Sequence, residues 1–325
     1  MALTPVDDVH ALQIQAGIFG RRAGHSFEDR IAQAINEFPY PCYIPDVAEG
    51  HVLRGDPAGL CLSYIGSREG FREIAAASAI STGALATSEE GKTWLSINGA
   101  DVCRCKSDIV VTLTGDRHGS RTIGVSTKQC NSATPTNAQL YFTTARGFAN
   151  LLGSNGIAVS NAAVQALRQF CGDTGFRPLD DPQILAGRVV DPRRFFWEET
   201  NANGRRQWER LLADRQDDVS RLLLQKAYIN DPFAPEYLLH KTKRADSWYR
   251  TEVALYSIDE LIALSHAYQG FSTKPYSVRK GSYKDPHGVT HLAPRFGAIQ
   301  MQRGGQRQHP EQLQFNLEAG YFYKL

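Results

Sequence analysis

The sequence lacks the features that mark membrane and secreted proteins. No stretch of the 325 residues approaches the roughly 18 uninterrupted apolar residues of a membrane span. The N-terminal sequence MALTPVDDVHALQIQAG has no basic region followed by an apolar core, so no secretory signal is expected. The hydrophobic content of 42% and the charged content of 22% are those of an ordinary soluble globular protein. We therefore expect a cytoplasmic protein without membrane contact.

Several chemical signatures are also missing. The six cysteines include no CxxC pair and no histidine at the spacing of a zinc site, so free thiols in a reducing cytoplasm are expected. No G-x-S-x-G motif is present, which argues against a Ser/His/Asp hydrolase with a nucleophile elbow. The stretch GSREGFRE lacks the lysine and the spacing of a phosphate-binding loop.

Net charge is low, at +2, but it is unevenly distributed. Residues 271–325 contain eight Lys or Arg and three Asp or Glu, so this segment carries +5 and the preceding 270 residues carry −3. A basic segment of this kind indicates a polyanionic partner, although a solvated basic surface explains the charge equally well.

Two signals organise the first half of the chain. Residues 26–38, SFEDRIAQAINEF, place apolar residues at helical spacing, and Ser26 with Asp29 forms a variant of the capping box. The prolines of PYPCYIP must end this helix. Further along, β-branched residues predict strands over 109–113 and 122–126, joined by the polar turn TGDRHGSR. We therefore expect a helix followed by a β-hairpin.

The hairpin is followed by two more predicted helices. Periodic apolar spacing predicts them over 138–152 and 161–172. A sheet between helices is the pattern of an α/β sandwich. The periodicity lapses over 175–190, and we place a boundary there, which gives domains at 1–180 and 181–325.

The C-terminal half has a different pattern. A charged amphipathic helix is predicted over 205–227, and a shorter helix over 257–270 ends at a glycine. Residues 295–305 and 312–323 alternate apolar and polar side chains, which is typical of paired antiparallel strands.

The predicted hairpin carries polar residues at one end. Asp108 precedes the first strand and Lys128 ends its antiparallel neighbour, so closure of the hairpin brings both to one rim of the sheet. Ser126 and Lys128 point to the same face, and Thr127 between them offers a backbone carbonyl. Mg²⁺ prefers hard oxygen ligands, and a lysine can orient an attacking water and offset charge on a phosphate. The rim therefore suits metal-assisted phosphodiester hydrolysis but lacks a second carboxylate.

Purely structural roles are also open for these residues. Asp108 could begin a turn, and Lys128 could protect an exposed edge strand from aggregation. Asp116 and His118 lie at the tip of the hairpin, away from the rim, and we interpret them as solvated turn residues.

The arrangement resembles the PD-(D/E)xK nuclease superfamily, and within it the type II restriction endonucleases, over roughly residues 20–170. In that superfamily an Asp precedes one strand and (D/E)xK ends the next. The sequence SD at 107–108 matches the first part and STK at 126–128 matches the second, so Ser126 replaces the acid. Some related enzymes take a substitute carboxylate from the helix after the lysine, but residues 138–152 contain no Asp or Glu.

The resemblance implies a fold and further site residues. The expected fold is a restriction-endonuclease-like α/β core, with a mixed central sheet flanked by helices, plus a C-terminal α+β region. The stretch GHSFEDRIAQAI is similar to the first helix of many members, where a Glu after an aromatic approaches the metal, here Glu28. Asp29 is the lesser candidate because it caps the helix, and the helix dipole alone favours acids in a first turn. Gln129 matches a glutamine common in related nucleases, which implies a contact with substrate or water. The expected Mg²⁺ ligands are Asp108, Glu28 and the Thr127 carbonyl.

The basic C-terminal region suits contact with double-stranded DNA. Base edges are read by Arg, Lys, Gln and Asn, while phosphates are held by Lys, Arg, Ser and Thr. A two-stranded β-ribbon with its turn is narrow enough to enter a major groove. An ordinary polar surface loop is the alternative interpretation. The expected phosphate contacts are Lys274, Arg279, Lys280 and Lys284, and the expected base-reading residues are Gln302, Arg303, Gln306, Arg307, Gln308 and His309, with the two arginines at guanines.

Together these features predict a Mg²⁺-dependent type II site-specific endodeoxyribonuclease. A homodimer is expected by resemblance, because palindromic sites call for two-fold symmetric readers. Two alternatives stay open: a structure-selective repair nuclease with the same core, and a non-catalytic DNA-binding protein, which the serine at position 126 makes conceivable.

Overall fold

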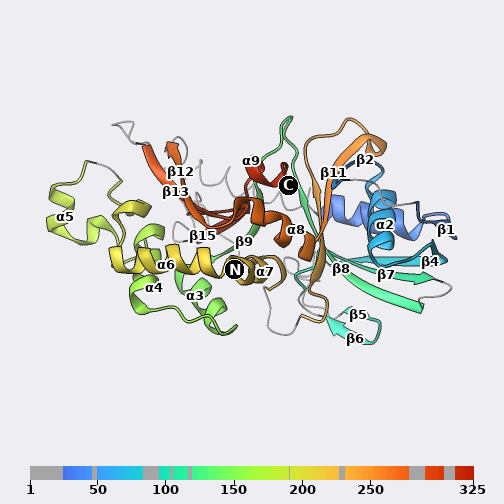
Figure 1. The fold of residues 1–325 in the computed structure, drawn as a ribbon, viewed down its shortest axis with the longest axis horizontal. Helices are drawn as coiled ribbons and strands as arrows, with labels where there is room; N and C mark the ends of the chain where they lie inside the picture. Colours follow the sequence, from blue (N-terminus) through green and yellow to red (C-terminus); the bar gives the residue numbers. More distant parts are fainter. Residues whose placement is uncertain are drawn as a thin grey trace, which may run out of the picture. The chain divides into compact units, whose positions relative to one another are not determined.

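The computed structural model describes the chain in segments and divides it into two compact units (Figure 1). One unit contains Met1–Ala138 and Leu224–Ala263, and the other contains Gln139–Leu223 and Leu264–Leu325. The chain therefore passes between the units three times, which differs from the single boundary placed between residues 180 and 181. The described residues are 25–45, 50–82, 95–102, 105–115, 119–189, 191–226, 231–277, 290–303 and 312–325.

The first unit is built on a six-stranded mixed sheet of order β2-β11-β10-β8-β7-β4. Only the β10–β8 pair is parallel among the five pairings of this sheet. A parallel pair needs a long crossover, and here more than 100 residues separate the two strands, which explains why the unit is discontinuous in sequence. Its strands are β2 (Val52–Gly55), β4 (Ala76–Ser81), β7 (Ile109–Gly115), β8 (Gly119–Gln129), β10 (Pro235–Lys241) and β11 (Thr251–Ser257).

Helices cover one face of this sheet. The helix over 25–36 and α2 (Pro57–Arg68) place their apolar residues in one core with alternate residues of the strands, such as Val111 and Val125. Asp56 caps α2 by accepting a hydrogen bond from the Ala58 amide at 3.1 Å. A mixed sheet flanked by helices confirms the α/β class expected for the core. The remaining elements of this unit are β1 (Cys42–Tyr43), β3 (Glu73–Ile74), β5 (Leu95–Ile97), β6 (Ala100–Val102), the 3₁₀ turn Trp248–Arg250 and α8 (Ile258–Ser265). The last two residues of α8 belong to the second unit.

The second unit contains a five-stranded sheet of order β12-β13-β14-β15-β9 and several helices. Aromatic residues fill its core: the Phe148 ring stacks on Trp208 at 5.4 Å and contacts Phe315 at 4.5 Å between centroids. Its elements are β9 (Ala138–Thr144), α3 (Ala145–Gly153), α4 (Asn161–Cys171), α5 (Pro182–Ala186), α6 (Ala202–Asp214), α7 (Gln216–Gln225), β12 (Phe271–Ser277), β13 (Thr290–Phe296), β14 (Ile299–Arg303), β15 (Gln312–Leu317), α9 (Ala319–Phe322) and the 3₁₀ turns Pro178–Asp180, Trp197–Glu199 and His266–Tyr268.

The helix predicted over 138–152 is half wrong. Its first part is strand β9, and α3 begins only at Ala145. The segment AQLYFTT alternates buried and exposed side chains at its start, as strands do, and it ends in two β-branched threonines. Thr144 then caps α3 by accepting a hydrogen bond from the Gly147 amide at 3.0 Å.

Other predicted elements are confirmed with shifted ends. The helix over 161–172 is α4, which ends at Gly172 in the left-handed conformation (φ 79°). The charged helix over 205–227 is two helices, α6 and α7, divided at Arg215. The C-terminal strands pair antiparallel as β14 and β15. Among the described residues, no helix combines the length and the apolar content needed to cross a membrane.

Candidate active site

The β7–β8 hairpin places Asp108 beside the end of β8. Ile109 pairs with Val125, and the Asp108 amide donates a hydrogen bond to the Val125 carbonyl at 2.9 Å. Because the strands are antiparallel, the residue that precedes β7 meets the residues that end β8. The strand β8 lies between β7 and β10, so Lys128 is not on an edge strand, and the edge-protection role is wrong.

One oxygen of Asp108 collects three hydrogen bonds from the STK segment. Its Oδ2 accepts from the Thr127 amide at 2.7 Å, from Ser126 Oγ at 3.1 Å and from Lys128 Nζ at 3.1 Å. The Lys128 ammonium also donates to Ser126 Oγ at 2.9 Å and to the Thr127 carbonyl at 2.6 Å. All three of its N–H groups therefore have acceptors inside the motif, and Ser126 takes part in this network without adding charge.

Glu28 reaches the same place from the helix over 25–36. Val125 and Thr127 alternate with Ser126 and Lys128 along β8, and Val125 belongs to the core that this helix covers. Thr127 Oγ1 donates a hydrogen bond to Glu28 Oε1 at 3.0 Å. Thr127 thus joins both carboxylates, because its amide binds one and its hydroxyl binds the other. The structure brings together the two acids that lie 80 positions apart in sequence.

Burial and charge set the protonation of Glu28. Burial of its carboxyl and the negative charge of Asp108 raise the pKa of Glu28 to about 7, and the Thr127 hydrogen bond, Lys128 and His25 only partly oppose this rise. Asp29, one position later, is exposed. The preference for Glu28 over Asp29 therefore agrees with the geometry, although its role as a ligand stays a prediction.

The oxygen atoms at this rim fit a hard divalent cation. The negative charge of Asp108 helps to raise the pKa of Glu28, so a positive charge placed between the two carboxyl groups is favoured, and Mg²⁺ is commonly held by one or two carboxylates with waters. Asp108 Oδ1 accepts no hydrogen bond from the described residues, whereas Oδ2 is fully used. Within the described part of the chain, no three His, Cys, Asp or Glu side chains form a potential metal cluster, so these residues would supply two carboxylates at most.

A second segment, which sequence reasoning missed, holds the Asp108 strand in place. Asp231 Oδ2 accepts a hydrogen bond from the Lys106 amide at 2.6 Å, and Ser107 Oγ donates to the Phe233 carbonyl at 2.6 Å. A Cβ at Gly124 would lie 2.2 Å from Ser107 Oγ, so only glycine allows this close approach. The available signal was weak, because a turn-forming Asp-Pro pair more than 120 residues away gives no indication of its partner.

His240 is another neighbour of the site that the sequence analysis missed. It pairs in register with Lys128 on the parallel strand β10 and is 1% exposed. Burial of the imidazole and the charge of Lys128 lower the pKa of His240 to about 3. The ring is therefore neutral in the folded protein at any pH near neutrality.

The pKa of His240 predicts a pH-dependent stability. Unfolded chains bind a proton at this histidine below about pH 6.5, whereas the folded protein does not until about pH 3. The free energy of unfolding should therefore fall as the pH drops below 6.5, by roughly 1 kcal/mol per pH unit from this group. Urea unfolding at pH 7, 6 and 5 should show this fall in the wild type relative to His240→Leu. Parallel stability curves for the two proteins would contradict it.

Gln129 presents an unused donor next to Lys128. Its Nε2 is buried and has no hydrogen-bond partner within the described residues. A buried amide N–H without a partner is costly, so a substrate or water acceptor would stabilise it. The Gln129 amide therefore has a donor available for the predicted contact with substrate or water. That contact stays a prediction.

The C-terminal residues expected to contact DNA are only partly visible. Arg279, Lys280, Lys284 and residues 306–309 lie outside the described residues. Lys274 forms a short ion pair with Glu318. Gln302 on β14 pairs with Gln314 on β15, and its side chain is half-buried.

Arg303 does not extend from the surface as a base-reading arginine would. Its guanidinium lies over the Phe196 ring, 4.6 Å from the centroid, and donates to the Phe195 carbonyl at 3.2 Å. We expect Arg303→Ala to lower the free energy of unfolding by about 1–2 kcal/mol through loss of this contact, as measured by urea denaturation. The neighbouring Gln302→Ala should change it by less than about 0.5 kcal/mol. An Arg303→Ala protein of unchanged stability that loses affinity only at a cognate DNA site would instead support guanine contact.

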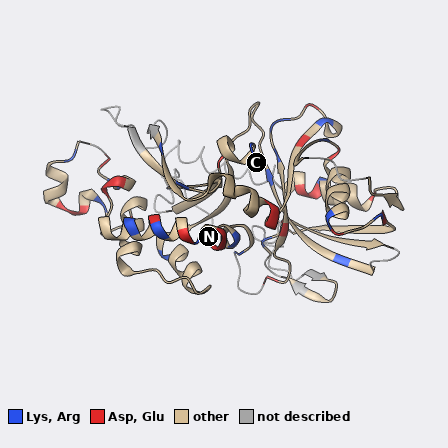
Figure 2. Cartoon of the chain, viewed as in Figure 1, with Lys and Arg blue, Asp and Glu red and all other residues tan. Residues whose placement is uncertain are grey.

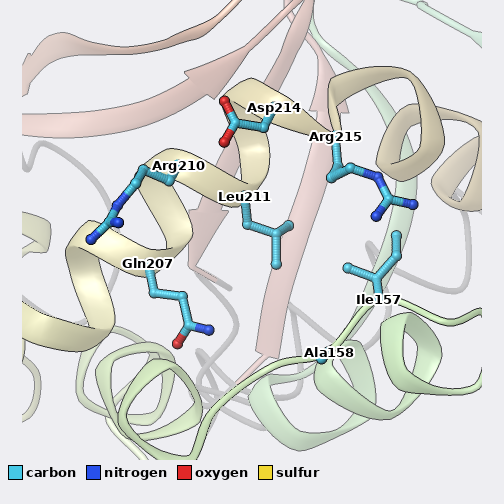
Figure 3. Close-up of a pocket in the computed structure, with 7 residues that line it drawn as sticks. All are labelled: Ile157, Ala158, Gln207, Arg210, Leu211, Asp214 and Arg215. Carbon is cyan, nitrogen blue, oxygen red and sulfur yellow. The ribbon is translucent and has the colours of Figure 1, made fainter.

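The second unit also contains a pocket of about 510 Å³ (Figure 3). Its lining combines apolar side chains with charged ones from α6 and its C-terminal end, and none of the predicted catalytic residues contributes to it. The lining residues are Ile157, Ala158, Gln207, Arg210, Leu211, Asp214 and Arg215.

Comparisons with known proteins give little independent information. No protein-family model matches the chain, and no curated protein matches it. Among solved structures, the chain is similar to the restriction endonuclease MspI in complex with its cognate DNA. The TM-score is 0.37 with 11% sequence identity, over 74% of this chain and 70% of that chain. The assignment of function therefore depends on the geometry of the rim.

Proposed function

We propose that this protein is a Mg²⁺-dependent endonuclease that hydrolyses phosphodiester bonds in double-stranded DNA, of type II restriction character. The observation that carries the proposal is the joining of Asp108 and Glu28 by Thr127, with the Lys128 ammonium on the same Asp108 oxygen. Two carboxylates and a lysine on one rigid sheet rim are what metal-assisted phosphodiester hydrolysis requires.

Each residue has a distinct role in this proposal. A bound Mg²⁺ ion polarises the scissile phosphate and makes a water ligand more acidic. The Asp108 and Glu28 carboxylates would hold the ion, and the Thr127 carbonyl would offer a third oxygen. By exchanging one of its three hydrogen bonds within the motif, the Lys128 ammonium would orient the attacking water, and its charge would offset negative charge that develops on the phosphate. Ser126 anchors Lys128 in the position that an acid occupies in related motifs.

A plasmid digest tests this function directly. Purified protein is incubated with supercoiled plasmid and with long linear DNA in Mg²⁺, in Ca²⁺ and in EDTA. Discrete bands that need Mg²⁺ are expected. Cutting only of branched or damaged substrates would indicate a structure-selective nuclease instead. Binding without cutting in Mg²⁺ or Mn²⁺ would contradict nuclease activity, and size-exclusion chromatography with light scattering tests the homodimer.

Replacing Glu28 should weaken Mg²⁺ binding rather than DNA binding. Glu28→Gln keeps the acceptor for Thr127 Oγ1 but removes a negative charge from the rim. We expect the Mg²⁺ concentration for half-maximal cleavage to rise at least about 10-fold. Asp29→Asn is the matched control, because Asp29 is the adjacent exposed acid. Equal Mg²⁺ requirements for Glu28→Gln and the control would exclude Glu28 as a ligand.

A further inference from the structure

A turn rich in basic and aromatic residues borders the candidate active site. It consists of Lys241, the last residue of β10, and residues 242–250, which join β10 to β11, in the sequence KTKRADSWYR. Figure 2 marks its lysines and arginines, and the turn lies next to β11 in Figure 1. We define the basic turn surface as Lys241, Arg244, Tyr249 and Arg250 of this turn together with Arg30 of the helix over 25–36.

The cations of the basic turn surface are not neutralised by acids. Lys241 Nζ donates to the neutral Asn131 Oδ1 at 2.9 Å, and the Arg30 guanidinium lies over the Trp248 ring at 4.1 Å. Arg244 and Arg250 are exposed. Among the residues that the structure describes, none of these four cations forms an ion pair.

Acids of the same region are few. Lys243 forms an ion pair with Glu252 at 2.8 Å, and both are excluded from the surface for that reason. Asp246 is the one acid within the turn, and Asp29 is exposed on the helix beside Arg30. The excess of positive charge therefore remains after these acids are counted, so the surface attracts a polyanion.

The protein backbone holds this surface next to the carboxylates. Register places His240 opposite Lys128, and the Lys241 carbonyl accepts from the Cys130 amide at 2.8 Å. The Arg244 amide donates to the Ser132 carbonyl at 2.8 Å. Ser132 lies four positions after Lys128, a span of at most roughly 14 Å.

The turn is fixed from the helix side as well. The Trp248 ring meets Phe27 edge-on at 6.0 Å between centroids, and Phe27 directly precedes Glu28. The turn thus contacts the helix that carries Glu28 and the residues that directly follow β8. Tyr249 beside it is 75% exposed, so its ring and its hydroxyl are open to solvent.

We propose that the basic turn surface binds the phosphate backbone of duplex DNA on one side of the bond to be cut. This inference rests on the proposed nuclease function for the identity of the polyanion. A rim that contains two carboxylates repels DNA, so unpaired cations beside it are needed to draw the backbone in. Arg244 and Arg250 bind phosphate oxygens, and Tyr249 offers its ring to a deoxyribose and its hydroxyl to a phosphate.

Binding of a random-sequence duplex in Ca²⁺, measured by fluorescence anisotropy over a salt series, tests the proposal. Arg244→Gln and Arg250→Gln should each lower the slope of log K against log salt by about 0.9 and weaken binding at 0.1 M salt roughly 5- to 10-fold. Tyr249→Ala should weaken binding without changing the slope. The control is Arg72→Gln, an exposed arginine with the same charge change near the other end of β7, where the Ala75 amide binds the Thr114 carbonyl.

The possible results separate this inference from the proposed function. An unchanged slope in Arg244→Gln and Arg250→Gln, or an equal change in Arg72→Gln, overturns the inference even if the wild type cuts plasmid DNA. A lowered slope confined to the turn variants supports it, even if no cleavage is found with any metal. A wild-type protein that binds anionic lipid vesicles but no duplex DNA overturns both.

Discussion

Asp108→Asn should abolish DNA cleavage while leaving the fold intact. The substitution keeps the size of the side chain and an oxygen that can accept the Thr127 amide, but it removes the charge that Lys128 and the proposed metal ion share. We expect cleavage to fall at least about 1,000-fold, which corresponds to about 4 kcal/mol of transition-state stabilisation. The measurement is single-turnover cleavage of a fixed plasmid substrate in Mg²⁺.

DNA-binding measurements show whether the variant has lost the cleavage step or the ability to bind DNA. In Ca²⁺, Asp108→Asn should bind duplex DNA as tightly as the wild type or more tightly, because a negative charge near the backbone is gone. Asp29→Asn, which removes an exposed acid from the neighbouring helix, should retain full cleavage. Cleavage by Asp108→Asn within a few-fold of the wild-type rate would refute the site assignment.

Lys128→Ala should produce the second large loss. Its ammonium makes three hydrogen bonds inside the motif, and its removal takes away the positive group nearest to Asp108 Oδ2. We expect cleavage to fall by roughly 100- to 10,000-fold, the range of general acid–base contributions.

A conservative replacement distinguishes chemistry from charge at this position. Lys128→Arg keeps the charge, but its planar guanidinium cannot reproduce the three-way contact to Asp108, Ser126 and the Thr127 carbonyl. It should therefore bind DNA like the wild type without restoring the cleavage rate. Lys324→Ala, an exposed lysine of the second unit, serves as the control. Full activity in Lys128→Ala would leave the lysine with a structural role only.

The part of the site that could be predicted is local in sequence. Asp108, Ser126 and Lys128 meet because a hairpin of β-branched strands closes between them, and both strands are confirmed. The helix over 26–38 was recognised from its apolar period, and the structure has a helix over 25–36. Its predicted cap was misplaced, because Ser26 already lies inside the helix.

The residues that were missed contact the site through long-range pairing. Asp231 and His240 belong to a segment more than 100 positions after the hairpin, and β10 was not predicted at all. Parallel pairing leaves no turn signal between its two strands, so neither the register nor the burial of His240 could be inferred. Arg303 shows the same limit, because its aromatic partners lie more than 100 positions before it.

The sequence alone determined the α/β class, the hairpin and the polar residues at its rim, because helical periods, strand alternation and turn composition act between neighbouring residues. The tertiary structure decided which distant side chains complete that rim: Glu28 through Thr127, Asp231 behind Asp108, and the basic turn beside Lys128. These contacts depend on the burial of apolar faces between elements far apart in the chain, and burial of that kind is a property of the packed core rather than of any local segment.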